Sequence, residues 1–303
     1  WNSDSDRVRA RDFLVQLVAE NHQQAYDLTL QAFRIAEAAQ WMTVVNSAGF
    51  FISHSADQVR LHTDAEVAAF VGKFTPELDP FNQSISKGGL TSPIAFPLQR
   101  AQNLAAWADI PAIVQAAHDD FAKISGRAPG AFFNTYGVDD QTRFAFVNYG
   151  FLSGTLRKFI DAARLEGIPV GLISGTMLRP FPERNLVDLI RRQSPKLQVL
   201  GIFDGTLDTT PGMVYTDLTS ALYKLDRDYS GRGPLAMNFR YDGGQNPSYS
   251  VLAGVLQRLI EAAKAGKVES PIQQLDRNSA GPAMALDFTG RPGEAAFSGQ
   301  TIV

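Results

Sequence analysis

A glycine-rich turn is the first place in this sequence where the residue types could bind an anion. The segment Gly150-Phe-Leu-Ser-Gly154-Thr155 lies between an expected strand and an expected helix. Backbone N–H groups at a helix N-terminus can bind phosphate, which makes Gly150, Gly154 and Thr155 anion candidates. The motif does not match G-x-G-x-x-G and lacks the lysine of a P-loop. We therefore favour a tight turn that needs small residues for close helix–strand packing.

Arg179-Pro180-Phe181-Pro182 is the second candidate, because Arg179 could bind an anion or a neighbouring subunit. The motif also has a simple structural explanation. Pro180 favours an extended Arg179, Pro182 suits a first helical position, and Glu183 suits a helix N-terminus. We therefore favour a helix-start signal with a structural ion pair.

Three polar residues end or follow an expected strand over residues 42–46, namely Asn46, Ser53 and His54. Loops at such strand ends contact ligands in parallel sheets, and a histidine there can act as acid, base or ligand. No recognisable pattern of Asp, Cys or Glu accompanies His54. A hydrogen-bonded loop histidine is therefore favoured, and Asn46, Ser53 and His54 remain weak candidates for cofactor binding.

The composition excludes several kinds of site. The 303 residues contain no cysteine, which excludes disulfides, thiolate nucleophiles, and zinc–thiolate or iron–sulfur sites ligated by this chain. The four histidines show no metal-ligand spacing, and the pairs Asp119-Asp120 and Asp139-Asp140 are typical of solvated surface, so we predict no metal site. A net charge of −3 offers no basic surface for nucleic acid. Without a membrane-length apolar run or a signal-peptide pattern, we expect a soluble, cytoplasmic protein.

The elements that would position the N-terminal candidates begin with a helical pattern over residues 7–39. Apolar residues three and four positions apart form one face there. Asn21 with Gln24 is typical of a capping box, so we expect two helices that meet near Asn21. Residues 42–46 are expected to form a buried strand that leads into a loop.

Two more helices are expected before the second half of the chain. Thr63 opens a short helix that ends at Gly72, and a helix over residues 102–125 ends at Gly126. Pro111 is expected to kink or divide the latter helix. The stretch between them is long and proline-rich, which favours a wrapping or interaction segment.

Strands and helices alternate from Phe132 onward, which is typical of βαβ units with a parallel sheet and helices on both faces. The expected strands cover residues 143–148, 168–174, 197–204 and 234–240, and the expected helices run to residue 166 and over residues 183–193, 217–225 and 248–265. The sequence therefore predicts an α/β fold.

A series of short motifs runs through both halves of the chain. Those before residue 75 are Asp6, Ala19-Glu20-Asn21, Gln23–Asp27, Ala32–Glu37, Val45–Phe50, Ser53-His54 and Val67–Val71. Those after it are Gly150–Thr155, Arg164–Leu172, Arg179–Pro182, Leu200–Asp204 and Gly243-Gly244. Their order and spacing resemble the α subunits of 2-oxoacid:ferredoxin oxidoreductases of the pyruvate synthase type.

The resemblance implies four parts. Residues 1–72 would be the C-terminal part of a thiamine-binding pyrimidine-type domain, and residues 73–131 a connecting and wrapping segment. Residues 132–268 would be a transketolase C-terminal-like parallel-sheet domain, and residues 269–303 a C-terminal tail. The composition from Ser279 onward, polar with scattered Gly and Pro, predicts that this part lies on a partner or is partly disordered.

The sequence departs from the family pattern at three points. The family's Asp-Gly-Phe is Ala48-Gly49-Phe50 here, and Gly205 replaces the arginine expected after Asp204. The family's first segment has no counterpart, and that segment carries the glutamate that activates the aminopyrimidine of thiamine diphosphate. We therefore predict no catalytic residue on this chain, and we expect the diphosphate anchor on another subunit.

The resemblance implies an α-type subunit of a complex that oxidatively decarboxylates a 2-oxoacid such as pyruvate on thiamine diphosphate with Mg. The electrons would pass through iron–sulfur clusters on partner subunits to ferredoxin, and the acyl group to coenzyme A. The implied partners are a thiamine diphosphate-binding β subunit, a γ subunit and a ferredoxin-like δ subunit. This chain alone is expected to be inactive.

Two alternatives stay open at this point. The chain could be a non-catalytic structural paralogue in such a complex, which the absent segment and Ala48 favour. A weaker alternative is an independent nucleotide-binding α/β protein that uses the turn at residues 150–155.

Overall fold

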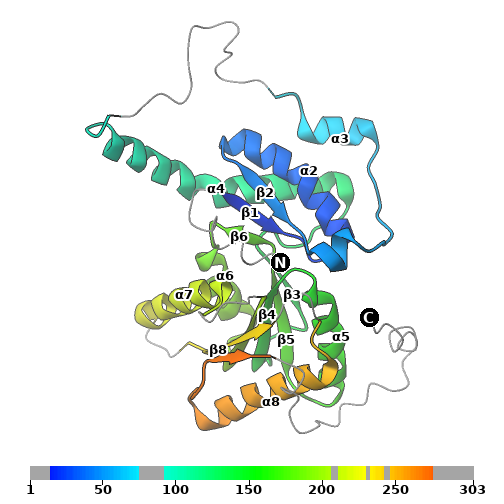
Figure 1. Cartoon of the computed structure of the whole chain (residues 1–303), viewed down its shortest axis with the longest axis vertical. Helices are drawn as coiled ribbons and strands as arrows, with labels where there is room; N and C mark the ends of the chain where they lie inside the picture. Colours follow the sequence, from blue (N-terminus) through cyan, green and yellow to red (C-terminus); the bar gives the residue numbers. More distant parts are fainter. Residues whose placement is uncertain (1–13, 75–91, 206–210, 230–232, 242–245, 276–303) are drawn as a thin grey trace, which may run out of the picture. The chain divides into compact units, whose positions relative to one another are not determined.

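The computed structural model describes residues 14–74, 92–205, 211–229, 233–241 and 246–275 (Figure 1). The chain forms two compact units. We call residues 5–133 with 176–182 the N-terminal unit, and residues 134–175 with 183–303 the C-terminal unit. The motif positions Asp6 and Gly243-Gly244 lie outside the described residues, as does most of the proline-rich stretch. The four-part division at residues 72, 131 and 268 stays a prediction.

The N-terminal unit contains a three-stranded sheet. Its central strand, β1 (Val15–Val18), pairs in parallel with β2 (Thr43–Asn46) and antiparallel with β6 (Met177–Arg179). The strand β2 confirms the predicted strand, although its four residues are half-buried rather than buried. The helix predicted before Asn21 is wrong, because β1 lies there. All four residues of β1 are buried, so the strand lacks the polar–apolar alternation of a half-buried strand. Without that alternation, the spacing of its apolar residues fitted a helical face, and the segment was predicted as a helix.

Local capping residues set the ends of the first two helices. Asn21 accepts the backbone N–H of Gln24 at 2.9 Å and begins α2 (His22–Ala39). Thr63 begins α3 (Asp64–Val71), which ends at Gly72, as predicted. The Gln24 side chain accepts from the N–H of Glu20 at 2.7 Å, so the reciprocal bond starts one residue earlier than in a standard capping box.

The third helix, α4 (Phe96–Ser125), begins six residues earlier than predicted and ends at Gly126, as predicted. It continues as one helix through Pro111, so Pro111 does not divide it, and a kink there stays a prediction. The helices α2, α3 and α4 pack against one another. Part of the segment predicted to wrap between domains is therefore a core helix of the N-terminal unit.

The capping box at Thr63 predicts a pH dependence of α3. The Glu66 carboxylate accepts the N–H of Thr63 at 2.8 Å and its hydroxyl at 2.9 Å, and these hydrogen bonds lower the pKa of Glu66. A lowered pKa contributes stability above the unfolded-state pKa, about 4.3, that is lost as pH falls through the folded-state pKa. We expect the protection of the first-turn amides of α3, taken relative to their intrinsic exchange rates, to fall below about pH 4. The Glu66→Gln variant should lack this acid-dependent step; the same step in that variant would contradict the assignment.

The C-terminal unit is built on a six-stranded sheet with the order β3-β5-β4-β7-β8-β9. The strands are β3 (Phe133–Tyr136), β4 (Phe144–Tyr149), β5 (Val170–Gly175), β7 (Val199–Gly205), β8 (Leu235–Tyr241) and β9 (Ile272–Gln274). The pairs β5–β4, β4–β7, β7–β8 and β8–β9 are parallel, which confirms the predicted parallel sheet. β9 lies within the range predicted as a C-terminal tail, and its three residues, none of them buried, gave no strand pattern.

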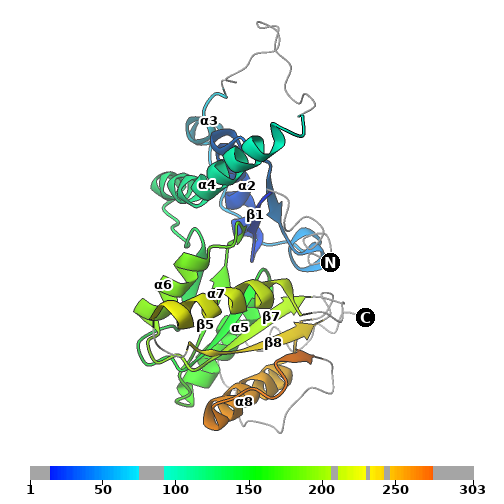
Figure 2. The same ribbon diagram turned by 90° about the vertical axis from the view of Figure 1, so that its left-hand side faces the viewer.

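Helices flank this sheet (Figures 1 and 2). They are α5 (Leu152–Leu165), α6 (Glu183–Gln193), α7 (Met213–Tyr229) and α8 (Tyr249–Ala265). α5 and α8 share one apolar core with Phe146, Phe203 and Phe239 from three neighbouring strands. α7 packs against β7, β8 and α6. The alternation of strands and helices therefore follows the prediction, although α7 starts four residues earlier.

Candidate functional site

The two parallel strands of the N-terminal unit end at the same edge of their sheet. Val18 is in register with Asn46, so the residues that follow β1 and β2 meet there. The N–H of Ala19 donates to the carbonyl of Asn46 at 2.8 Å. We call residues 19–22 and 46–55 the β1–β2 edge. In open α/β sheets, ligands bind outside such carboxyl ends.

Ser53 and His54 lie at this edge, at the end of a π-helical turn, η1 (Gly49–Ser53). The Ser53 hydroxyl donates to the Gly49 carbonyl at 2.6 Å and lies 2.9 Å from His54 Nδ1. His54 Nδ1 is also 2.5 Å from that carbonyl. Because Nδ1 serves the local turn, only Nε2 of this exposed ring remains for another contact. Both residues stay predictions as cofactor contacts.

Asn46 differs from these two residues in its hydrogen bonding. Its Nδ2 is buried and has no hydrogen-bond partner in the described part of the chain. A buried donor left unpaired costs about 1–3 kcal/mol, so such groups point to a missing partner. Of the predicted cofactor contacts, Asn46 is therefore the one whose geometry calls for a ligand or a partner chain.

A buried glutamine on β1, Gln16, lies on the same face of the sheet as Asn46. It was not selected as a candidate from the sequence. Gln16 is 1% exposed, and neither its Nε2 nor its Oε1 has a partner among the described residues. Its register neighbour on β2 is Val44, two residues before Asn46, so Gln16 and Asn46 lie on one face. Arg179 on β6 is its other register neighbour, but the pairing of β1 with β6 is irregular between Gln16 and Leu17. The only sequence signal was a polar residue inside the apolar run Val15–Val18.

Arg179 is buried on β6, where its guanidinium donates to the Leu178 carbonyl at 2.7 Å. The Arg179–Pro180 peptide bond is cis. Glu183 begins α6 directly after Pro182 and pairs with Lys224 at 2.7 Å. This ion pair belongs to Glu183, so the structural ion pair expected at the arginine of the motif stays a prediction. The interface or anion role of Arg179 stays a prediction.

The turn after β4 is held by buried hydrogen bonds. Gly150 has φ +92°, a conformation that favours glycine. Asn148 Nδ2 donates to the Gly150 carbonyl at 3.1 Å and to Ser153 Oγ at 3.0 Å, and Ser153 Oγ lies 3.1 Å from Ser174 Oγ. These contacts supply the geometry that a tight turn requires. Neither Asn148 nor Ser174 was singled out in the sequence.

Thr155 and Gly154 lie just inside α5, after this turn. Thr155 Oγ1 accepts from Asn246 Nδ2 at 2.8 Å. A Cβ at Gly154 would meet no atom within 4 Å, so this residue faces open space. The surroundings of Gly154 thus leave room for a ligand. Gly150, Gly154 and Thr155 stay predictions as anion contacts.

A buried carboxylate caps α7 from the end of β7. Asp204 accepts the N–H of Val214 at 3.1 Å, the N–H of Tyr215 at 3.2 Å and Nδ2 of Asn238 at 2.8 Å. Burial raises the pKa of the nearby Tyr241 phenol, and the negative charge of Asp204 raises it further. Asp204 therefore orients the start of α7. Its partners lie 10, 11 and 34 residues away, which concealed this role in the sequence.

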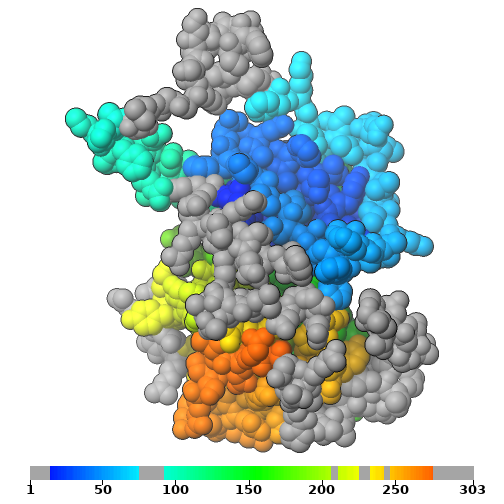
Figure 3. Space-filling view, viewed as in Figure 1, coloured from blue at the N-terminus to red at the C-terminus, as the bar shows by residue number. Residues whose placement is uncertain are grey.

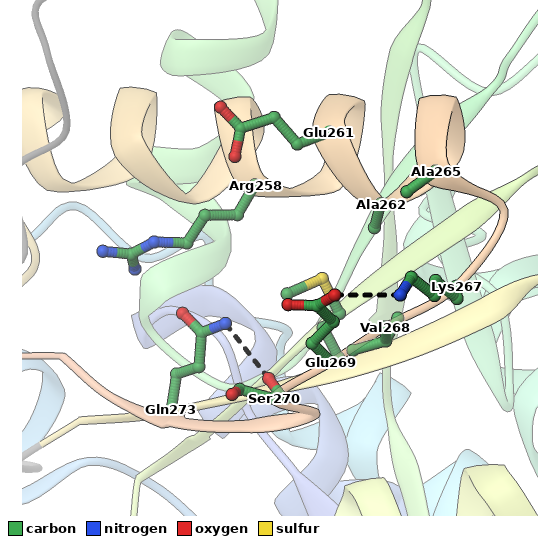
Figure 4. A pocket seen from close by; sticks show the side chains of 10 residues that line it. Arg258, Glu261, Ala262, Ala265, Lys267, Val268, Glu269, Ser270 and Gln273 are labelled. Atoms are coloured by element: carbon green, nitrogen blue, oxygen red, sulfur yellow. Dashed lines mark hydrogen bonds and ion pairs between the residues drawn. The ribbon is translucent and has the colours of Figure 1, made fainter.

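A pocket of about 410 Å³ lies elsewhere in the C-terminal unit, beside α8 and β9 (Figure 4). Its charged lining residues are Arg258, Glu261, Lys267 and Glu269, of which Lys267 and Glu269 pair at 2.9 Å. Two acids and two bases give this pocket no net preference for anions or cations. No candidate residue lines it.

Two structural findings bear on the kind of site that the described residues could form. Within the described ranges, no three His, Asp or Glu side chains are grouped so as to hold a metal ion. Nor does any helix there have both the length and the apolar character that a membrane span requires.

Comparison with known proteins identifies families and relatives that this chain resembles. A family model described as pyruvate flavodoxin/ferredoxin oxidoreductase, thiamine diphosphate-binding, matches residues 1–116. A second, described as pyruvate:ferredoxin oxidoreductase core domain II, matches residues 143–245. Pyruvate synthase subunit PorA of Pyrococcus abyssi is 31% identical over 280 residues, which cover 90% of this chain and 68% of the relative. This chain belongs to the family of 2-oxoacid:ferredoxin oxidoreductase α-type subunits. The predicted family is therefore confirmed.

Other relatives of this α-type subunit have different named substrates. Ketoisovalerate oxidoreductase subunit VorA of Pyrococcus horikoshii is 24% identical over 278 residues, covering 90% of this chain and 68% of the relative. The alpha subunit of NADH-dependent phenylglyoxylate dehydrogenase of Aromatoleum evansii is 28% identical over 241 residues, covering 75% and 57%. Membership of the family therefore does not fix the 2-oxoacid.

A solved structure supports the fold of this α-type subunit. The 2-oxoglutarate:ferredoxin oxidoreductase of Magnetococcus marinus, with 2-oxoglutarate, coenzyme A and succinyl-CoA bound, matches with a TM-score of 0.50 and 12% identity. The match covers 82% of this chain and 42% of the other. At this identity the likeness concerns the fold alone.

Proposed function

We propose that this α-type subunit supplies one wall of a thiamine diphosphate site in a complex that oxidatively decarboxylates a 2-oxoacid such as pyruvate. Electrons pass from this site through iron–sulfur clusters on partner subunits to ferredoxin, and the acyl group passes to coenzyme A. The partners are a thiamine diphosphate-binding β subunit, a γ subunit and a ferredoxin-like δ subunit. The chain alone is inactive.

The observation that carries this proposal is the set of unpaired amide atoms on the sheet that ends at the β1–β2 edge. Asn46 Nδ2 and both polar side-chain atoms of Gln16 are buried without a partner among the described residues. They lie within residues 1–116, which match the thiamine diphosphate-binding family model. Amide donors and acceptors suit neutral polar groups such as a ring nitrogen, an exocyclic amine or a peptide.

Asn46 and Gln16 could form one side of a thiamine diphosphate site, but they could not form the complete site. The amides fit a ring with donor and acceptor atoms, and Asn46 is the nearer of the two to the strand ends. The described residues group no carboxylates that would hold the Mg ion of a diphosphate. Thiamine diphosphate, when bound, supplies the thiazolium that stabilises negative charge after decarboxylation. This chain would orient the ring and exclude water, while the diphosphate anchor and the clusters lie on partners.

Replacing Asn46 with leucine is expected to change activity and stability in opposite directions. The change removes one hydrogen bond to the ligand, so kcat/KM for 2-oxoacid-dependent reduction of a viologen dye should fall about tenfold in the assembled complex. It also removes a buried unpaired donor, so the free energy of unfolding of the isolated chain should rise by about 1 kcal/mol. Steady-state kinetics and urea unfolding check the two effects.

Thr43→Val is the matched control, because Thr43 lies at the opposite end of the same strand and the change is nearly isosteric. We expect its kcat/KM to stay within about twofold of the wild type. Unchanged kcat/KM in Asn46→Leu would show that this amide does not face the cofactor. A stability loss with unchanged activity would make Asn46 a structural residue.

A second candidate function is a structural paralogue that keeps the subunit contacts without contributing to the cofactor site. Its support is Ala48, a buried residue at the β1–β2 edge where the family pattern has an aspartate. The two functions differ in one assay. A purified complex without thiamine, iron or 2-oxoacid-dependent dye reduction would exclude the catalytic function.

A further inference from the structure

A serine, a histidine and an aspartate meet beside the β1–β2 edge, although the histidine precedes the serine by 33 residues in the sequence. His22 is the first residue of α2, and Ser55 and Asp57 follow η1. His22 Nε2 lies 3.1 Å from the Ser55 hydroxyl, and His22 Nδ1 lies 3.7 Å from the Asp57 carboxylate. In this order a histidine can activate a hydroxyl for nucleophilic attack.

The aspartate favours one of the two neutral forms of the His22 ring. Beside a carboxylate the proton is more stable on Nδ1, because that N–H is attracted to the negative charge. Nε2 then carries a lone pair and can only accept a hydrogen bond. The hydroxyl and the carbonyl of Ser55 both lie 3.1 Å from Nε2. A carbonyl cannot donate, so of these two groups only the hydroxyl can bond to Nε2 in this form.

The Ser55 hydroxyl has a second acceptor within reach. Its oxygen lies 2.8 Å from the Phe51 carbonyl, as well as 3.1 Å from His22 Nε2. A hydroxyl rotates about its C–O bond, so its proton can turn from the carbonyl to the imidazole without movement of the backbone. The Phe51 carbonyl therefore holds the hydroxyl in place, and His22 can take its proton when a substrate is bound.

The base and the hydroxyl differ in their exposure. The His22 side chain is 18% exposed, whereas Ser55 is exposed. The segment around residue 50 that leads to Ser55 lies at the surface in Figure 3. A substrate can therefore reach the hydroxyl, while the imidazole is held by its surroundings. Because α2 begins at His22, the first N–H groups of this helix, which have no partner inside it, lie beside the pair and suit an oxyanion.

A second serine–histidine pair in the same segment lacks this arrangement. The Ser53 hydroxyl lies 2.9 Å from His54 Nδ1 and donates to the Gly49 carbonyl at 2.6 Å. His54 Nδ1 is itself 2.5 Å from that carbonyl. A carbonyl only accepts, so this Nδ1 carries a proton and cannot take another from Ser53. Ser53 is therefore a matched control for Ser55.

We propose that Ser55 is a nucleophile that accepts acyl groups, with His22 as its general base and Asp57 as the residue that positions the imidazole. The substrate class is a small acyl group carried as an ester or a thioester, since an exposed serine depends on a good leaving group. This activity needs neither thiamine nor a partner subunit. It is therefore independent of the oxidative decarboxylation, for which the chain alone is inactive.

The reaction has two steps and needs no oxidant or reductant. In the first, His22 Nε2 takes the hydroxyl proton, Ser55 Oγ bonds to the acyl carbon, and the bond from that carbon to the leaving oxygen or sulfur breaks. His22 gives the proton to the leaving group. In the second, water attacks the acyl-serine, the C–Oγ bond breaks, and a proton passes from the water through His22 to Oγ. The products are a carboxylic acid and an alcohol or a thiol.

Labelling with a fluorophosphonate ester tests the nucleophile directly, because such probes form a stable adduct with an activated serine hydroxyl. The full chain is labelled and digested, and tandem mass spectrometry locates the adduct. We expect the adduct on Ser55, and labelling at least about tenfold slower in His22→Gln. A wild-type chain without an adduct on Ser55, or equal labelling of Ser53 and Ser55, would overturn the proposal.

Hydrolysis of p-nitrophenyl acetate by the full chain provides the second readout. We expect Ser55→Ala to lower kcat/KM at least about tenfold, because it removes the nucleophile. Ser53→Ala should change kcat/KM less than about threefold. Circular dichroism confirms that both variants are folded. Equal losses in the two variants, or unchanged hydrolysis in Ser55→Ala, would contradict the role of Ser55.

Two variants of Asp57 separate its charge from its place in the loop. Asp57→Asn keeps the size of the side chain but removes the charge that favours the Nδ1 proton, so kcat/KM should fall about fivefold. Asp57→Glu keeps the carboxylate and should retain at least about half of the wild-type kcat/KM. Equal losses in both variants, or no loss in Asp57→Asn, would show that the carboxylate does not position His22.

Discussion

Replacing Asp27 with alanine is expected to lower the free energy of unfolding of the N-terminal unit by about 3 kcal/mol. Asp27 is 4% exposed, and its two carboxylate oxygens accept from Nε and Nη2 of Arg127 at 2.8 and 2.7 Å. Removing the carboxylate leaves a guanidinium without its partner. Breaking such a buried pair costs about 3–5 kcal/mol, and the 23% exposure of Arg127 places the effect at the lower end.

This pair links two parts of the N-terminal unit that the sequence separates by 100 residues. Asp27 lies on α2, and Arg127 follows the end of α4. Gln23, one turn before Asp27, donates to the same carboxylate at 2.9 Å and also to the Arg60 carbonyl at 3.2 Å. The ion pair therefore fixes the helix whose first turn lies at the β1–β2 edge.

Urea unfolding of the isolated chain measures the effect, with Asp57→Ala as the control. Asp57 also has a basic partner, His22 at 3.7 Å, but its side chain is 63% exposed, so its loss should cost less than about 0.5 kcal/mol. A second variant tests the cause. Asp27→Leu with Arg127→Met removes both charges, and it should be more stable than Asp27→Ala. Similar losses in Asp27→Ala and Asp57→Ala would refute the buried-pair explanation.

The sequence predicted those elements whose limits are set by neighbouring residues. The helix α3 has its N-cap, its acidic first turn and its final glycine within ten residues. The helix α6 matches the prediction at both ends, because Pro182 precedes it directly and its apolar residues follow a clear helical period. Strong local signals of this kind are independent of the rest of the fold.

Elements that depend on distant partners were not predictable in the same way. β6 has three residues, and it is a strand because it pairs with β1, more than 150 positions earlier. β1 itself is buried on both faces, which removed the alternation that marks a strand. Such elements are defined by tertiary contacts that no short sequence window contains.

The residues of the candidate site also differ in whether local sequence or distant contacts identify them. Asn46 could be proposed because it ends a recognisable strand, and Arg179 because its motif resembles a family pattern. That both residues lie on strands next to Gln16, and that Asn46 shares its face, required the pairing of β2, β1 and β6. The position of Asp204 at the start of α7 likewise depends on how the chain returns to β7.

Truncating Phe146 to alanine is expected to lower the free energy of unfolding of the C-terminal unit by about 4 kcal/mol. Phe146 is fully buried on β4, and its ring packs against Phe159 of α5 at 6.0 Å and Phe203 of β7 at 5.5 Å between centroids. The change removes most of a large apolar side chain from a filled core. The neighbouring strands on both sides prevent the backbone from collapsing into the cavity.

Thermal and urea unfolding measure this loss against two related variants. Phe146→Leu keeps much of the volume and should cost only about 1 kcal/mol, whereas Leu165→Ala, at a site 72% exposed, should cost less than about 0.5 kcal/mol. The order of the three losses tests the packing, because it follows the volume removed from the core. If Phe146→Ala were no worse than Leu165→Ala, β4 would not lie at the centre of this sheet. The buried hydrogen bonds that Asn148 makes at the end of β4 depend on the same placement of the strand, so they would be contradicted as well.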